Sequence, residues 1–516
     1  MKVRVFSRAL AVTAVTAVTA LGAAGVAGTA HASAAPSTAQ AAVKAAPAGA
    51  KPYDFNGDGY PDLALGSPYG TVGSLTTAGF VTIVYGSASG PNTAKKQVIS
   101  QDTAGVPGVA EKADHFGFSL TSFDYDEDGY ADLIVGAPDE DTTAGSNAGS
   151  ETILWGSSSG LTGSDSQALN EPDSPGADHR FGYSLVAADF DGDGHTDWVD
   201  GVPGINAFYP FHNPGPPAVA AKSTTTRPGR ALPPAPHAQT VRKGKKAATA
   251  AAADSTTTGF ILAAGDVDGD GKPDLVLGWQ QTVAPTSGFD VWHNFTDTGL
   301  SHANTAATSL NSVAVGDFDG DGYGDIAVGG ADESEGVGGH VKVYKGDADV
   351  TLGTTTTLTQ DSDNVPETAV AGDRFGYSVA AGDVNKDGKA DLAVGAPYKT
   401  VTSQSHAGEF FLLYGGASGL TGTASQAVSQ DTAGVPGAAE ADDELGWTVN
   451  LTDVNKDGYA DVIGGSPKEN GTDGAVTYLG GTASGVTATG SQGWGAGTLG
   501  VTGRDAQIGV RQGRDG

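Results

Sequence analysis

Short apolar runs that end at glycine recur along the chain, with 51 to 77 residues between the starts of successive copies. They read LALG at 63–66, LIVG at 133–136, WVDG at 198–201, LVLG at 275–278, IAVG at 326–329, LAVG at 392–395 and VIGG at 462–465. Runs of this length and composition are typical of short buried strands. Other runs end in an aromatic residue and a turn, as in FVTIVYGSASG at 80–90, ETILWGSSSG at 151–160 and FFLLYGGASG at 410–419. The pattern predicts a chain built of β-hairpins.

A nine-residue acidic segment with the pattern D-x-[DN]-x-D-G-x-x-D stands directly before each glycine-ended run. We call this segment a cage and number the cages one to seven in chain order. The copies are DFNGDGYPD at 54–62, DYDEDGYAD at 124–132, DFDGDGHTD at 189–197, DVDGDGKPD at 266–274, DFDGDGYGD at 317–325, DVNKDGKAD at 383–391 and DVNKDGYAD at 453–461. Complete copies at quasi-regular spacing indicate a repeat architecture.

The spacing of the acidic residues predicts a calcium site in each cage. Ca²⁺ prefers about six to eight oxygen ligands, and side chains at positions 1, 3 and 5 of a tight loop can converge on one ion. Glycine at position 6 permits the sharp turn, the carbonyl oxygen of position 7 adds a ligand, and Asp at position 9 closes the cage. Without a cation the clustered carboxylates would repel one another. The loop is not an EF-hand, because position 12 never holds Glu and the flanking runs predict strands.

The predicted metal ligands follow from these positions. By cage, they are Asp54, Asn56, Asp58, Tyr60 and Asp62; Asp124, Asp126, Asp128, Tyr130 and Asp132; Asp189, Asp191, Asp193, His195 and Asp197; Asp266, Asp268, Asp270, Lys272 and Asp274; Asp317, Asp319, Asp321, Tyr323 and Asp325; Asp383, Asn385, Asp387, Lys389 and Asp391; and Asp453, Asn455, Asp457, Tyr459 and Asp461. Residues at position 7 are expected to bind through the carbonyl oxygen alone. The sequence thus predicts up to seven structural Ca²⁺ ions and no catalytic residue.

Two further motifs bracket the cages. Upstream stand Phe116-Gly117, Phe181-Gly182, Phe375-Gly376 and Leu445-Gly446, and downstream stand Gly66-Ser67-Pro68, Gly136-Ala137-Pro138, Gly201-Val202-Pro203, Gly395-Ala396-Pro397 and Gly465-Ser466-Pro467. The order FG, cage, GAP resembles the FG-GAP repeat of the N-terminal propellers of integrin α-subunits, over about residues 53–510. The fourth and fifth repeats depart from it, because they lack the FG pair and read Gly278-Trp279-Gln280 and Gly329-Gly330-Ala331 at the GAP position.

The repeat length and number indicate the architecture. A repeat of about 66 residues suits a four-stranded blade, and seven repeats suit a seven-bladed ring. The predicted fold class is all-β, a seven-bladed β-propeller of FG-GAP repeats with calcium-binding hairpin loops. The first repeat has no FG pair, whereas Ile508-Gly509 lies where a further FG would fall. We therefore expect the C-terminal segment 505–516 to supply a strand to the first blade and hide two sheet edges.

Segments outside the repeat pattern complete the domain organisation. Residues 1–32 join the basic residues Lys2, Arg4 and Arg8 to an uncharged stretch and a small-x-small site, which predicts a secretory signal peptide. Residues 33–52 predict a flexible leader, and 53–516 the propeller. Within the propeller, 205–258 predicts a Pro/Ala/Thr-rich basic insertion or a degenerate outer edge of blade three or four. A basic arm for an acidic polymer or surface is the alternative.

Composition narrows the set of partners. The chain of 516 residues has 28 Lys plus Arg against 60 Asp plus Glu, a net charge of −32. This acidity disfavours nucleic acid and anionic membranes and favours cations. Cysteine is absent, which excludes disulfides, thiolate zinc sites and cysteine nucleophiles. No second apolar stretch of about 20 residues follows the signal peptide, so no membrane span is predicted in the mature chain.

Two features that look functional have a simpler interpretation. Residues 156–160 match the G-x-S-x-G nucleophile motif, but that motif needs a strand-to-helix turn. The sister turns at 86–90 and 415–419 carry Ala at the central position. Trp155 holds the strand-end position that Tyr85 and Tyr414 hold in other repeats, which favours core packing over sugar stacking.

These observations predict a secreted, extracellular, monomeric calcium-binding propeller. The integrin resemblance implies a binding, adhesion or recognition module for an extracellular protein or glycan, with the ligand surface opposite the cages. Two alternatives stay open. One is a polysaccharide lyase or hydrolase site on the propeller, and the other is a glycan-binding lectin.

Overall fold

The computed structural model describes residues 50–172, 175–213, 215, 237–238, 257–281, 287–296, 299–503 and 505–513. The predicted signal peptide 1–32, residues 33–49 of the predicted leader and most of 205–258 lie outside the described residues. All described residues belong to one compact unit, Pro47–Gly516, and they form strands, turns and three very short helices.

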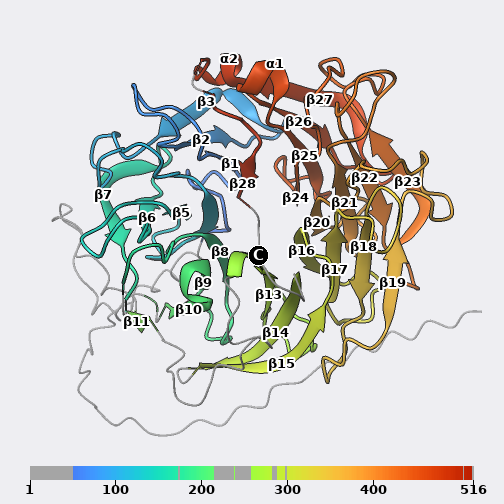
Figure 1. The fold of residues 1–516 in the computed structure, drawn as a ribbon, viewed down its shortest axis with the longest axis horizontal. Helices are drawn as coiled ribbons and strands as arrows, with labels where there is room; N and C mark the ends of the chain where they lie inside the picture. The colour runs from blue at the N-terminus through green and yellow to red at the C-terminus, as the bar shows by residue number, and fades with distance from the viewer. Residues whose placement is uncertain are drawn as a thin grey trace, which may run out of the picture. The chain divides into compact units, whose positions relative to one another are not determined.

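The described strands form seven four-stranded antiparallel sheets, which we call blades and number by their cages. Within each blade the strands lie side by side in the order inner, second, third and fourth. Figure 1 shows the blades following one another around a common centre. The predicted fold class, an all-β seven-bladed propeller, is confirmed.

The inner half of each blade consists of two strands, named in order from blade one to blade seven. The inner strands are β28 (Arg511–Gln512), β4 (Ser119–Phe123), β8 (Ser184–Ala188), β12 (Thr257–Gly265), β16 (Ser312–Gly316), β20 (Ser378–Gly382) and β24 (Thr448–Thr452). The second strands are β1 (Leu63–Ser67), β5 (Asp132–Ala137), β9 (Asp197–Val202), β13 (Asp274–Gln281), β17 (Asp325–Gly330), β21 (Asp391–Ala396) and β25 (Asp461–Ser466).

The outer half of each blade is less regular. The third strands are β2 (Phe80–Tyr85), β6 (Ser150–Trp155), β10 (Ala207–His212), β14 (Ser287–Thr296), β18 (His340–Tyr344), β22 (Glu409–Tyr414) and β26 (Ala475–Gly480). The fourth strands are β3 (Asn92–Ile99), β7 (Thr162–Leu169), β11 (His237–Ala238), β15 (Gly299–Ala307), β19 (Thr355–Leu358), β23 (Thr421–Val428) and β27 (Thr487–Gly495). The helices are η1 (Pro203–Ile205), α1 (Glu469–Thr472) and α2 (Ala496–Leu499).

Burial explains the apolar pattern of the sequence. The glycine-ended runs are the second strands, and nearly every residue in them is buried because neighbouring blades cover both faces. Fourth strands such as β3 and β7 contain exposed residues. Each main core cluster mixes residues of adjacent blades; Leu63 and Phe80 of blade one, for example, pack with Ile463 and Val476 of blade seven.

The glycines of the FG and GAP motifs face each other between blades. A Cβ atom added to Gly136 of blade two would overlap the carbonyl oxygen of Gly182, which leads into blade three. The same overlap would occur between Gly395 and Gly446. The paired motifs therefore mark places where two backbones approach too closely for any side chain.

The C-terminal segment closes the ring. Strand β28 pairs with β1 through Leu65↔Gln512 and Gly66↔Arg511, and it is the inner strand of blade one in Figure 1. Ile508 bridges to Gly474 of blade seven in the way that Phe181 bridges to Gly149 of blade two. The expected closure is thus confirmed. Cages two to seven each join an inner strand to the second strand that follows it, whereas cage one precedes β1 and takes its inner strand from the C-terminus.

The segment 205–258 overlaps two blades at its ends. Ala207–His212 is the third strand of blade three, and Thr257–Gly265 is the inner strand of blade four. The fourth strand of blade three is the two-residue β11, the shortest fourth strand among the described residues. The irregular outer edge therefore falls in blade three.

The two simpler interpretations of the functional-looking motifs hold in the structure. Residues 156–160 form the turn between β6 and β7, so a strand follows the turn where a nucleophile motif requires a helix. The Trp155 side chain is fully buried, and its Nε1 atom donates a hydrogen bond to the carbonyl oxygen of Asp165 (2.7 Å). Trp155 is therefore a core residue.

A buried carboxyl pair joins blades two and three. Glu151 in β6 and Asp200 in β9 are both 0% exposed and share a hydrogen bond. Burial raises the pKa of Glu151 to about 8. Burial, followed by the Glu151 charge, raises the pKa of Asp200 well above its usual value. The pair therefore favours a shared proton in the folded state.

This pair should make stability depend on pH. Because the folded pKa of Glu151 lies above its ordinary value of 4.5, the folded state holds more protons, and the free energy of unfolding should fall as pH rises from about 4.5 to 8. Asp200→Asn keeps an acceptor for the Gly182 amide and should flatten this fall, raising stability at pH 8 by on the order of 1–3 kcal/mol. Urea unfolding at pH 5 and 8 measures both values. Asp349→Asn, at an exposed site, is the control, and equal pH slopes for Asp200→Asn and the parent would contradict the assignment.

Candidate functional site

Each cage is a tight loop with the same backbone geometry. The glycine at position 6 has a φ of 86–92° in all seven cages, a left-handed conformation that other residues rarely adopt. Its amide donates to Oδ2 of the Asp at position 1, with N···O distances of 2.8–3.0 Å. The amide of position 7 donates to Oδ1 of the Asp at position 5, at 2.8–3.2 Å. The loop therefore curls around its own carboxylates.

The structure brings the predicted side-chain ligands together. Ligand oxygens lie within 4.8 Å of one another in the sets Asp124, Asp126 and Asp132; Asp189, Asp191 and Asp197; and Asp266, Asp268 and Asp270. Asp54 is buried, yet its Oδ1 atom has no hydrogen-bond partner among the described residues, and the same holds for Oδ1 of Asp266. Clustered hard oxygens with buried unpaired atoms are the donor set that suits Ca²⁺.

The Asp at position 9 holds the blade together as well as the cage. In cage six, Oδ2 of Asp391 accepts from the Val384 amide (2.9 Å), and Oδ1 accepts from the Gly415 amide after the third strand (3.0 Å). The same two bonds are made by Asp62, Asp132, Asp325 and Asp461. Position 9 therefore clamps the start of the cage to the third strand.

Burial makes the position-9 carboxyls hard to ionise without a cation. The pKa of Asp62 is raised to about 8, chiefly by burial and further by the nearby Asp58 and Asp54 charges. The pKa of Asp391 is raised to about 6, and that of Asp461 to about 7, with burial again the largest cause. A bound cation would favour the charged forms and pull these pKa values down.

Successive cages touch around the ring. The Ala131 amide of cage two donates to the Asp54 carbonyl of cage one (2.9 Å), and equivalent bonds link cages four and five, five and six, and six and seven. Side chains at position 7 reach the preceding cage: Tyr130 packs on Gly57, and Lys272 Nζ donates to the Asp191 carbonyl (2.8 Å). The position-7 side chains thus contact the preceding cage. Only the backbone carbonyl oxygen of position 7 can then serve as a ligand in its own cage.

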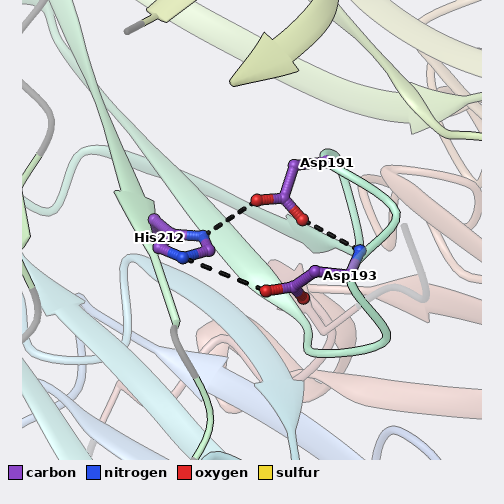
Figure 2. Close-up of side chains that lie close together, drawn as sticks. All are labelled: Asp191, Asp193 and His212. Carbon is purple, nitrogen blue, oxygen red and sulfur yellow. Dashed lines mark hydrogen bonds and ion pairs between the residues drawn. The ribbon is translucent and has the colours of Figure 1, made fainter. Parts of the chain in front are cut away.

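Three basic side chains next to the cages were missed by sequence reasoning. His212 contacts Asp191 and Asp193 of cage three, as Figure 2 shows. His293 contacts Asp268 of cage four, and Lys345 contacts Asp319 and Asp321 of cage five. All three come directly after the residue of the third strand that pairs with the first residue following position 9. Tyr85, Trp155 and Tyr414 hold the same register position in other repeats. Aligning the seven repeats at this position of the third strand would have revealed these basic residues.

The opposite ends of the inner strands form a second candidate site. The strands surround a central cavity of ≈ 660 Å³. Phe118, Tyr183, Tyr377 and Trp447 each follow an FG-type pair, and together with Arg511 they line the cavity; we call these five residues the collar. Phe118 and Tyr183 have ring centroids 4.8 Å apart, Tyr377 and Trp447 4.6 Å, and the Arg511 guanidinium lies 4.5 Å from the Phe118 centroid.

The collar and the cages lie on opposite faces of the propeller. An inner strand begins next to the collar residue and runs directly into its cage, as Phe118, β4 and Asp124 show. All five collar side chains are half-buried. Aromatic faces and a guanidinium around a cavity are the features of a ligand-binding surface.

Fold and loops together define a seven-bladed β-propeller with one acidic cage in each blade. The FG-GAP repeat family matches residues 48–84, 116–151, 258–281, 309–344, 375–413 and 445–479. The chain therefore carries FG-GAP repeats in six of its seven blades, and it is similar to integrin α-subunits. Blade three lies outside the matched segments, although its cage 189–197 is complete.

Known proteins share parts of this chain. Integrin alpha-PS5 of Drosophila melanogaster is 32% identical over 186 residues, which cover 35% of this chain and 17% of the integrin. Phosphatidylinositol-glycan-specific phospholipase D of Rattus norvegicus is 32% identical over 151 residues, 29% of this chain and 17% of the enzyme. The chain thus spans about a sixth of the length of these relatives. The solved exotype rhamnogalacturonan lyase YesX covers 75% of this chain and 65% of its own, at 15% identity and a TM-score of 0.28.

No helix among the described residues combines the length and apolar character needed to cross a membrane.

Substitutions in cage six should distinguish the structural role of position 9 from that of a position that serves only as a predicted metal ligand. Asp391→Asn would turn an amide NH₂ toward a backbone N–H and should lower the free energy of unfolding by about 1–3 kcal/mol, even in chelator. Asp387→Asn at the exposed position 5 should change stability in chelator by less than about 0.5 kcal/mol. Urea unfolding in EDTA makes the comparison. Equal losses for the two variants would show that position 9 is not a clamp.

Proposed function

We propose that the protein is a secreted, calcium-stabilised FG-GAP propeller that binds an extracellular protein or glycan through its collar. The collar is the observation that carries this proposal. It gathers four half-buried aromatic side chains and one arginine around the central cavity, away from the cages that hold the blades in place. The FG-GAP family and the integrin relatives support a recognition or adhesion role.

Calcium fits the cages whose surroundings supply oxygen donors without a competing base. Cages one, two, six and seven have Tyr85, Trp155, Tyr414 and Gly480 at the end of the third strand. In these cages Ca²⁺ would be held by the side chains of positions 1, 3 and 5, with position 9 and the carbonyl of position 7 completing the shell. The ion would neutralise charge that the fold packs together on one face.

The propeller can recognise a ligand without any catalytic group. Stacking on Tyr377 and Trp447 suits the apolar face of a sugar or an aromatic side chain, and Arg511 suits a carboxylate or a cation–π partner. A polysaccharide lyase or hydrolase remains the alternative function, and a lectin is a special case of the binding role. Binding and cleavage assays with one set of glycans distinguish them.

Calcium should raise the melting temperature. At a calcium concentration 100-fold above its Kd, each site that binds only the folded state should contribute about 2.7 kcal/mol. Differential scanning calorimetry of the mature protein in CaCl₂ and in EDTA measures the shift. Mg²⁺ at equal ionic strength is the control, because this smaller ion demands near-ideal octahedral geometry. A melting temperature that is the same in CaCl₂ and EDTA would rule out a structural role for the ion.

Ligand binding should depend on the collar. Trp447→Ala should weaken binding of the strongest hit from glycan and matrix-protein arrays at least tenfold, because it removes a stacking face. Tyr323→Ala, on the cage face at position 7 of cage five, is the matched control and should leave the affinity unchanged. Retention of full affinity by Trp447→Ala would move the binding site away from the collar. Chain cleavage of the same glycan would favour the enzymatic alternative.

A further inference from the structure

One position per blade, at or near the end of the third strand, lies beside the start of the second strand, where the cage ends. It follows the residue that pairs with the first residue after position 9, as in Phe211↔Trp198 followed by His212. We call this position the strand-end slot. Its occupants from blade one to blade seven are Tyr85, Trp155, His212, His293, Lys345, Tyr414 and Gly480. Three consecutive blades thus carry a base where the other four carry a neutral residue.

In cage three, the base enters the carboxylate cluster itself. His212 Nδ1 lies 3.1 Å from Asp191 Oδ2 and 3.2 Å from Asp197 Oδ1, and Nε2 lies 3.9 Å from Asp193 Oδ2. Figure 2 shows the imidazole between the carboxylates of Asp191 and Asp193. Donor atoms of Asp191, Asp193 and His212 all lie within 4.8 Å of one another.

The same cage leaves buried polar atoms unpaired. Asp197 is 0% exposed, and although Oδ1 accepts from the Asn213 amide (2.8 Å), Oδ2 has no hydrogen-bond partner among the described residues. His212 Nδ1 also makes no well-formed hydrogen bond there, despite its two close carboxylate oxygens. A fully buried carboxylate oxygen without a partner, in the same cage as a ring nitrogen that has close carboxylates but no well-formed hydrogen bond, indicates that the cage takes up a further partner.

Cage four repeats the arrangement. His293 Nδ1 lies 2.9 Å from Asp268 Oδ2, and donor atoms of Asp268, Asp274 and His293 lie within 4.8 Å of one another. Asp274 is 2% exposed. Cage four also contains the buried unpaired Oδ1 of Asp266. Two neighbouring cages therefore offer an imidazole together with two or more carboxylates.

Cage five receives an ammonium group instead. Lys345 Nζ contacts Asp319 Oδ2 and lies 3.0 Å from Asp321 Oδ2, so it pairs with the ligands of positions 3 and 5. A lysine ammonium is a compact point charge with three donors and no acceptor. It supplies within the chain the positive charge that a metal ion would supply from solution.

We propose that the strand-end slot decides which cation each cage holds: cages three and four bind a first-row transition ion such as Zn²⁺ through imidazole and carboxylates, and Lys345 occupies cage five in place of a metal. Imidazole is a good ligand for Zn²⁺ and a poor one for Ca²⁺, which takes oxygen donors. One imidazole and two or three carboxylates match the four-coordinate preference of Zn²⁺. The proposal goes beyond the proposed function, since it needs neither a ligand at the collar nor calcium in the other four cages.

Exchanging slot residues between blades tests the histidine cages. Metal-free protein should take up two Zn²⁺ ions in calorimetric titration, and His212→Tyr and His293→Tyr should each remove one. Tyrosine is the residue that blades one and six carry in the slot, so the variants keep a side chain the fold accepts. The reverse exchange, Tyr414→His, is the matched gain-of-site variant and should add one Zn²⁺ ion. Unchanged Zn²⁺ stoichiometry in both histidine variants would overturn the assignment.

A measurement on the unaltered chain tests the proposal even if the histidine variants fail to fold. Zn²⁺ should shift the ring-nitrogen NMR signals of two of the ten histidines, and the slot histidines identified by substitution should be those two. Zn²⁺ added in the presence of excess Ca²⁺ should give the same shifts. Loss of the shifts under Ca²⁺ would mean that the ions compete for ordinary oxygen cages, which contradicts the proposal.

Lys345→Tyr tests the ammonium in cage five. The variant should bind one more Ca²⁺ ion than the parent in equilibrium dialysis, because it exposes the carboxylates of Asp319 and Asp321. Lys342→Tyr, three residues earlier in the chain, is the control and should leave the count unchanged. An equal calcium count for Lys345→Tyr and the parent would show that Lys345 does not stand in for a metal. Failure of calcium to stabilise the protein at all would instead count against the proposed function.

Discussion

The structure depends on one constraint: the second strand of every blade is almost wholly buried and must be covered from both sides. A single blade cannot do this, because each of its faces needs a neighbour, and an open row of blades would leave two faces bare. Closing the row into a ring removes the problem. The two-residue strand β28 completes blade one from the far end of the chain, and Ile508 packs beside Gly474 of the last blade. The FG and GAP glycines let the backbones approach closely enough for this packing.

The same ring concentrates negative charge. The inner strands of blades two to seven each run into their cage at the same end, so these cages meet on one face. Backbone hydrogen bonds such as Ala131 to Asp54 bring cage one into contact with cage two. Burial then raises the pKa of carboxyls such as Asp62 and Asp461. In three cages a basic side chain next to the carboxylates offsets part of this charge. We propose that a bound cation does so in the others.

The cages could be predicted from sequence because all their parts lie within nine residues. The glycine at position 6, the clustered carboxylates and the strand that follows are local features, and the structure reproduces them. His212, His293 and Lys345 could not be assigned in that way, because they stand 15 to 20 residues after position 9 of their cages and reach them only through strand register. The sequence did show that Tyr85 and Tyr414 end a strand. It did not show that this position of the strand lies next to the cage. The collar could not be predicted from local sequence either, since residues such as Phe118 and Trp447 lie far apart in the chain.

The sequence by itself determined the repeat, the all-β architecture, the number of blades and the loops that gather carboxylates, because each follows from a short local pattern repeated along the chain. Ring closure could also be inferred, since the missing FG at one end matches Ile508-Gly509 at the other. Only the tertiary structure decided which side chains meet a cage from a neighbouring strand and which line the central cavity. These depend on register and on the ring, and contacts between residues far apart in sequence leave no local pattern to read.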